Sequence, residues 1–189
     1  MKEELTRQSI KLFEQKGFSE TSIQDIVDSI GVTKGSFYYH FTSKESLLMD
    51  IHLRYIDELL SRQKVIIDSQ ESYRTKIVKF VTLLINDIKA QGSYGRVYFR
   101  EMRNLTPENA DIIKAKRRTF RLNIEQTIKE GIKTGEFRNN LQPEMITFAI
   151  LGVTNWSYQW FNPSGEVSAK ELAEMFSEFV LYGIHSKEE

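Results

Sequence analysis

The sequence contains no cysteine, three prolines and ten glycines in 189 residues. The absence of cysteine excludes disulfides, thiolate metal sites and cysteine nucleophiles, and it suits a reducing compartment. No uninterrupted apolar run approaches the ~20 residues of a membrane helix, and the start of the chain is charged, unlike a signal peptide. Lys and Arg total 26 and Asp and Glu total 26, so no net charge attracts nucleic acid nonspecifically. We therefore expect a cytoplasmic protein that binds no membrane.

The apolar residues recur mainly at helical spacing, whereas strand-like alternation is scarce. Most glycines and prolines fall where such helical patterns begin or end. The sequence therefore predicts an all-α fold of about nine helices and no sheet. The expected helices cover about 3–15, 22–30, 33–41, a long segment from 43, 72–90, 95–104, 107–134, 143–161 and 168–185.

Local motifs mark three of the expected helix starts. The segments Thr42–Glu45 and Ser168–Glu171 have the spacing of a capping box, in which two side chains satisfy the first free N–H groups of a helix. Thr106 and Pro107 combine a cap with a proline at the first helical position. Each motif predicts a helix that begins at that point.

Two short helices are joined through Gly31, Val32 and Thr33, which is typical of a helix-turn-helix. Gly31 permits a positive φ, Val32 can fill the small core between the helices, and Thr33 can cap the second helix. Residues 31–44 contain no carboxylate, as expected of a surface that faces phosphates. Residues 1–48 carry six Lys/Arg and seven Asp/Glu, so DNA binding is expected to be modest and sensitive to salt.

Residues 31–47, GVTKGSFYYHFTSKESL, resemble the recognition-helix signature of the TetR family of transcriptional regulators. Leu12-Phe13, Gly17-Phe18 and Ile26 match the family too, whereas Val27 and Ile30 replace its usual alanines. The resemblance implies a three-helix DNA-binding domain over residues 1–46. It also implies a helical domain for effector binding and dimerisation over residues 47–189. The alternative is a small helical subdomain without a DNA-binding role.

The resemblance also implies which residues face DNA. Gly35 would let the backbone approach the duplex closely, and Lys44 would hold a phosphate, whereas Phe37 and Phe41 would lie in the core. The expected DNA-facing residues are Ser22, Thr33, Lys34, Gly35, Ser36, Tyr38, Tyr39, His40 and Lys44.

An aromatic helix is expected near residues 149–161, and it is apolar nearly all round. Such a helix is normally buried on all sides, so one side could face an effector chamber and another a partner subunit. The alternative is core and dimer interface alone. Ala149 and Gly152 would permit close helix approach and favour an interface on their face.

A basic segment spans residues 96–121, with eight Lys/Arg against three Asp/Glu. It could be a solvated helix face, but a cationic mouth beside an apolar tunnel suits an amphiphile such as an acyl-coenzyme A. Residues 100–108, 131–137 and 152–165 are similar to a TetR subgroup that controls fatty-acid, steroid or phenylacetate breakdown and responds to acyl-coenzyme A. The expected effector-binding residues are Arg96, Phe99, Arg100, Arg103, Arg117, Phe120, Arg121, Asn155, Trp156 and Trp160.

These expectations combine into a homodimeric repressor that binds a palindromic operator and is released by an effector, without a cofactor. An enzyme is disfavoured because no catalytic or metal-binding constellation appears. A purely architectural DNA-binding protein would not need so large an apolar C-terminal part. The nearest alternative is a TetR-type regulator of multidrug efflux with an aromatic pocket. Cationic drugs favour acidic pockets, however, whereas residues 96–121 are cationic.

Overall fold

The computed structural model describes residues 1–184, in which there are eight α-helices, one short 3-10 helix and no strand. The prediction of an all-α fold is thus confirmed, and the predicted count of about nine is close. The last helix was expected to end at His185, which lies outside the described residues. The helices are α1 (Lys2–Lys16), α2 (Ile23–Asp28), α3 (Lys34–His40), α4 (Lys44–Asp68), α5 (Tyr73–Glu101), the 3-10 helix η1 (Met102–Asn104), α6 (Pro107–Lys133), α7 (Pro143–Trp160) and α8 (Ala169–Ile184).

One predicted capping box is confirmed and the other was assigned to the wrong residues. At α8, the backbone N–H of Glu171 donates to Ser168 Oγ, and the N–H of Ser168 donates to the Glu171 carboxylate. At α4 the reciprocal pair is Ser43 and Ser46, with backbone-to-hydroxyl distances of 2.9 and 3.1 Å, rather than Thr42 and Glu45. Glu45 instead accepts hydrogen bonds from the Thr106 N–H and the Asn109 amide, at 3.0 and 2.9 Å.

The predicted break near Gln91 is present as a kink within α5. Gln91 has φ −135° and ψ 33°, which lie outside helical geometry, and helical structure resumes directly after it. The predicted short helix at 95–104 is therefore the continuation of α5 followed by η1. The Gln91 amide donates to Glu58 Oε1 at 2.6 Å, which anchors the kink to α4.

The chain folds into two compact units, each assembled from two stretches of sequence. Unit 1 comprises residues 1–57 and 93–116, and unit 2 comprises residues 58–92 and 117 onward. The core of unit 1 contains side chains of α1 to α4 and of α5 after the kink, such as Phe13, Phe37 and Tyr98. The predicted core residues Phe37 and Phe41 are both buried.

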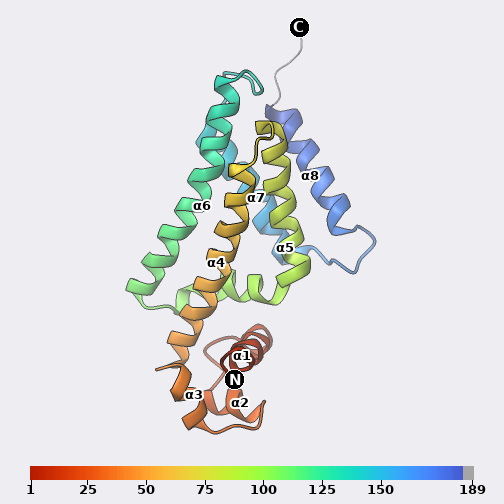
Figure 1. Ribbon diagram of the computed structural model, residues 1–189. Coiled ribbons are helices and arrows are strands. Elements are labelled where there is room, and N and C mark those ends of the chain that lie inside the picture. The colour runs from red at the N-terminus through yellow and green to blue at the C-terminus, as the bar shows by residue number, and fades with distance from the viewer. Residues whose placement is uncertain (185–189) are drawn as a thin grey trace. The chain divides into compact units, whose positions relative to one another are not determined.

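Unit 2 is a bundle of the remaining helical segments, among which α7 and α8 pack together (Figure 1). Its core includes Phe80, Ile124, Ile150 and Leu172, contributed by four different helices. Within the single chain, α7 is buried on one side only, which leaves another side for the partner subunit expected from the sequence. Its Thr154 and Tyr158 side is buried, whereas Trp156 is 67% exposed. The apolar periphery of α7 therefore faces outward.

Candidate DNA-reading surface and effector region

The helix-turn-helix is built by local hydrogen bonds that the sequence motif predicts. Ser22 begins α2 with a capping box, in which its hydroxyl accepts from the Asp25 N–H and the Asp25 carboxylate accepts from the Ser22 N–H. Gly31 has φ +67°, the left-handed conformation that the turn requires. Thr33 then caps α3 by accepting from the Ser36 N–H at 3.3 Å. These bonds fix the start of α3 relative to α2.

The outer face of α3 carries exposed side chains that can form hydrogen bonds. Tyr39 is 85% exposed, and Lys34 and Tyr38 are exposed as well. The inner face holds Phe37, whose ring centroid lies 5.7 Å from that of Phe41. The helix therefore presents polar and aromatic groups outward while its apolar side anchors it.

Gly35 occupies a helical position that the fold does not require to be glycine. Its φ is not positive, and a Cβ added there would meet only Thr33 Oγ1, at an ordinary contact distance of 3.5 Å. Glycine inside a helix costs about 0.5–1 kcal/mol relative to alanine. Because packing within the chain does not repay that cost, the missing side chain favours close approach by an external ligand.

A shallow hollow of about 440 Å³ lies over the same part of α3. It is lined by Met1 and by five residues of the predicted DNA-facing set, Thr33, Gly35, Ser36, Tyr39 and His40. The surface thus combines hydroxyl, phenol and imidazole groups with an opening at the glycine. Such groups can reach base edges or phosphate oxygens.

Lys44 is engaged in internal contacts. Its ammonium donates to the carbonyl oxygens of Phe18 and Thr21, at 2.6 and 2.5 Å, and lies 3.4 Å from that of Ser19. It also lies 4.3 Å from the centre of the Phe18 ring. Burial lowers the pKa of Lys44. Because its ammonium lies within hydrogen-bond distance of three carbonyls, Lys44 holds the loop between α1 and α2 in place, and its phosphate contact stays a prediction.

In unit 1, two of the predicted effector-binding arginines contact α1. Arg96 Nε donates to Glu14 Oε1 at 2.5 Å, and its guanidinium forms an ion pair with the same carboxylate. Arg100 donates to the carbonyl of Phe13 and, at 3.0 Å, to that of Glu14, so it caps the end of α1. Phe99 is half-buried and Arg103 is exposed.

The other six predicted effector-binding residues lie in unit 2. On α6, Arg121 bonds to Glu125 and Glu144 at 2.9 and 3.3 Å, and its guanidinium carbon lies 5.1 Å from the Phe148 ring. Phe120 is buried and Arg117 is exposed. On α7, Asn155 is half-buried, whereas Trp156 and Trp160 are exposed. The two tryptophans therefore lie on the outer face of α7.

Sequence reasoning missed a buried polar network in the core of unit 2. The Asp87 carboxylate on α5 is fully buried, pairs with Arg62 of α4 and accepts from the Tyr158 hydroxyl of α7 at 2.8 Å. Gln63 of α4 is also fully buried and donates to the Phe120 carbonyl at 2.9 Å. The sequence feature that could have indicated this network is Asp87, a carboxylate within the apolar pattern of residues 84–88.

Family models match both halves of the chain. Residues 5–51 match the model described as "Bacterial regulatory proteins, tetR family". Residues 70–184 match the model described as "Tetracyclin repressor-like, C-terminal domain". The second match alone covers more than half of the chain.

A sequence relative and two solved structures agree with these models. The HTH-type transcriptional repressor KstR2 of Rhodococcus jostii is 30% identical over 177 residues, 93% of this chain and 86% of the relative. The ketosteroid transcriptional regulator KstR2 of Mycobacterium tuberculosis has the same fold, with a TM-score of 0.91, 24% identity, and coverage of 98% of this chain and 95% of the other.

The second structure is AibR in complex with isovaleryl coenzyme A and operator DNA. It gives a TM-score of 0.85 at 21% identity, over 94% of this chain and 96% of the other. The helix-turn-helix geometry, the two family models and the KstR2 relative of Rhodococcus jostii all indicate the same family. The chain belongs to the TetR family and is a DNA-binding transcriptional repressor of that family.

Proposed function

We propose that the protein acts as a homodimer, that α3 of each subunit reads one half of a palindromic operator, and that an acyl-coenzyme A thioester releases the dimer from DNA. The DNA-reading part rests on one observation, the outer face of α3 at Gly35 and Tyr39, which is open, hydrogen-bonding and free of carboxylates. Two such helices fit successive major grooves when they lie about 34–36 Å apart.

The proposed dimer interface is the outer face of α7 and α8. Trp156 and Trp160 on α7, together with Phe179 and Tyr182 on α8, are all more than half exposed in the single chain. An apolar patch of this kind favours a partner, and a second copy of the same two helices would cover it as a four-helix bundle.

The proposed effector class rests on the ligands named for two proteins that have the same fold as this chain. AibR binds isovaleryl coenzyme A together with operator DNA, and KstR2 is described as a ketosteroid regulator. Among the basic residues 96–121, Arg103 is exposed and suits a phosphate-bearing effector, whereas Arg96 and Arg121 are paired with carboxylates. Because effector and operator binding are linked, an effector that weakens DNA binding must itself bind more weakly in the presence of DNA.

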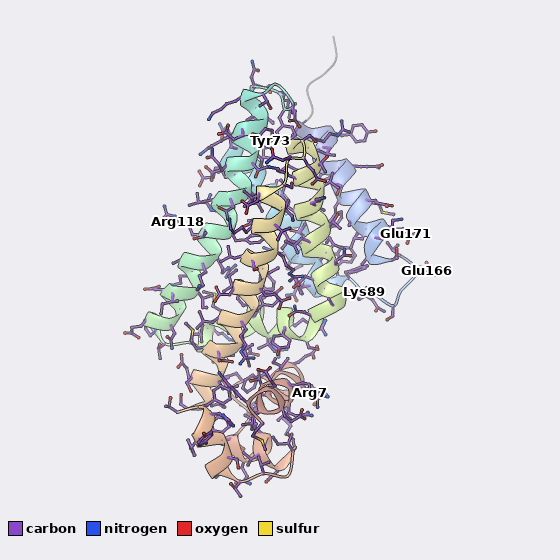
Figure 2. All side chains as sticks on the ribbon, viewed as in Figure 1. Arg7, Tyr73, Lys89, Arg118, Glu166 and Glu171 are labelled. Carbon is purple, nitrogen blue, oxygen red and sulfur yellow. The ribbon has the colours of Figure 1, made fainter. Side chains whose placement is uncertain are left out.

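The DNA-reading assignment is tested by operator titration at several salt concentrations, with an operator selected from random duplexes. Lys34→Ala should weaken binding and reduce the slope of log K against log salt by about 1 if Lys34 meets one phosphate. Tyr39→Ala should raise Kd about tenfold. Lys89→Ala is the control, because Lys89 is exposed on α5 in unit 2 (Figure 2). Unchanged operator affinity in both α3 variants would contradict the assignment.

The effector assignment is tested by adding acyl-coenzyme A thioesters of increasing chain length to the operator complex. Release at one range of chain lengths is the expected result. If no thioester releases the operator while a cationic drug does, the effector class is wrong and multidrug regulation takes its place.

A further inference from the structure

A groove of about 370 Å³ opens in unit 1, away from the hollow over α3. Residues 15–20, at the end of α1 and in the following loop, form one wall. Arg100, Glu101 and Arg103 form the other. A site of this size can enclose a nucleotide-sized portion of a ligand, since small-molecule pockets typically span roughly 300–1,000 Å³.

The groove offers cations to a ligand. Lys16 and Arg103 are exposed, and the side chain of Arg100 is 44% exposed. Two carboxylates also line the groove, those of Glu20 and Glu101. The Glu101 oxygens are bonded to Arg100 Nε and Asn104 Nδ2, at 2.7 and 2.8 Å, so Arg100 compensates the charge of Glu101 and the remaining cations are Lys16 and Arg103. Arginine and lysine in this arrangement are the usual partners of phosphate groups.

The loop wall adds an aromatic surface and a positive charge behind it. Phe18 is half-buried, with Lys44 on its ring, and it lines the groove. Lys44 also donates to the carbonyl oxygen of Phe18, at 2.6 Å, so this acceptor of a groove-lining residue is already satisfied. A half-exposed phenyl ring beside cations suits an adenine base linked to phosphates, because bases stack on aromatic rings.

We propose that this groove binds the phosphorylated adenosine end of a coenzyme A thioester, an inference that rests on the effector class proposed above. Arg100 connects the groove to α1, the first helix of unit 1. It lines the groove and also donates to the last carbonyls of α1, including that of Glu14 at 3.0 Å. A phosphate beside Arg100 competes for the same N–H groups, so occupancy loosens the hold of α5 on α1.

The test is calorimetric titration of the full chain with free coenzyme A and, separately, with inorganic pyrophosphate. Arg103→Ala and Lys16→Ala should each weaken coenzyme A binding about tenfold, the loss expected for one charge-assisted contact. Lys89→Ala is the control, because Lys89 is exposed, lies in unit 2 and is outside the basic residues 96–121 (Figure 2). Pyrophosphate should bind more weakly than coenzyme A and be affected by the same two variants. Thermal unfolding of each variant checks that the fold is intact.

The outcomes separate this inference from the proposed function. If acyl-coenzyme A releases the operator equally well from the wild type and from the Lys16→Ala/Arg103→Ala double variant, the groove assignment is wrong and the effector class stands. If free coenzyme A binds in the groove but no thioester releases DNA, the groove stands and the effector class fails. A wild type that binds no coenzyme A overturns the groove. So does a loss of operator affinity in Arg103→Ala accompanied by a reduced salt slope, because the groove would then hold DNA.

Discussion

Lys44 illustrates how one residue can satisfy a family pattern by a different contact from the expected one. Its ammonium is directed at backbone carbonyls of the loop between α1 and α2, at distances down to 2.5 Å. These hydrogen bonds from Lys44 stabilise the fold of unit 1, and they support the helix-turn-helix by fixing the loop before α2. Lys34, in contrast, is exposed on α3.

These two lysines therefore predict different responses to substitution. Lys44→Ala should lower the thermal unfolding midpoint, because three carbonyls lose their donor, and should leave the salt slope of operator binding unchanged. Lys34→Ala should leave the unfolding midpoint unchanged and reduce that slope by about 1. Differential scanning calorimetry and operator titration at three salt concentrations measure both quantities. A reduced salt slope in Lys44→Ala would instead support a phosphate contact.

The distance along the sequence between a residue and its partner decides which roles could be predicted from the sequence. Thr33, Gly31 and Ser168 act within four residues of their own position, so their roles as caps or turn residues were readable from spacing. Glu45 and Arg96 act on partners 61 and 82 positions away, and no local pattern reveals such distant partners. The same limit hid the buried pairing of Asp87 with Arg62 and Tyr158.

At the scale of elements, the segment of α5 after Gln91 is joined to α1 and α4 by polar contacts. Arg96 and Arg100 reach α1, and the two ring nitrogens of His52 lie 2.9 and 3.2 Å from the carbonyl oxygens of Leu48 and Tyr98. Movement of this segment would therefore act on α1 directly as well as through α4.

The contact between Glu14 and Arg96 should make this junction sensitive to acid. Burial raises the pKa of Glu14, but hydrogen bonds from Ser93 and Arg96 outweigh it and hold the pKa below its usual value. A carboxyl group with a lowered folded-state pKa stabilises the protein above its unfolded pKa of about 4.3, and this contribution is lost as pH falls through the folded-state pKa. Glu14→Gln should thus lower the unfolding midpoint at pH 7, and the difference from wild type should vanish at acid pH.

Thermal unfolding measured between neutral and acid pH checks this sign. Glu166→Gln is the control, because Glu166 is exposed in the loop before α8 and should show no pH-dependent difference (Figure 2). A difference between Glu14→Gln and wild type that grows as pH falls would contradict the role given to the Arg96 contact.

At the scale of the whole molecule, the exposed apolar residues of α7 and α8 connect assembly to DNA reading. Tyr182 is 86% exposed and Phe179 is 67% exposed on α8, alongside Trp156 on α7. Exposure of several large apolar side chains on two adjacent helices is expected to be relieved by a second subunit. In the proposed dimer each subunit supplies one reading helix, so loss of the interface should cost most of the operator affinity.

Phe179→Asp should therefore convert the proposed dimer to monomers, detected by sedimentation velocity, because an unpaired charge would be buried at the proposed interface. Operator affinity should fall at least about a hundredfold in parallel, since two linked contacts are replaced by one. Val65→Asp is the matched control, because Val65 is exposed on α4. A variant that stays dimeric would place the interface elsewhere.

The two-stretch construction of unit 1, residues 1–57 with 93–116, limits how such regulators can be recombined. A hybrid made by one crossover after the recognition helix would join the α1 of one parent to the Arg96 and Arg100 equivalents of another. In such a hybrid, the residue that pairs with Glu14 and the residue that caps α1 would come from the other parent. Functional hybrids should need both stretches from the same parent, so operator specificity should be transferred only when the two segments are exchanged together.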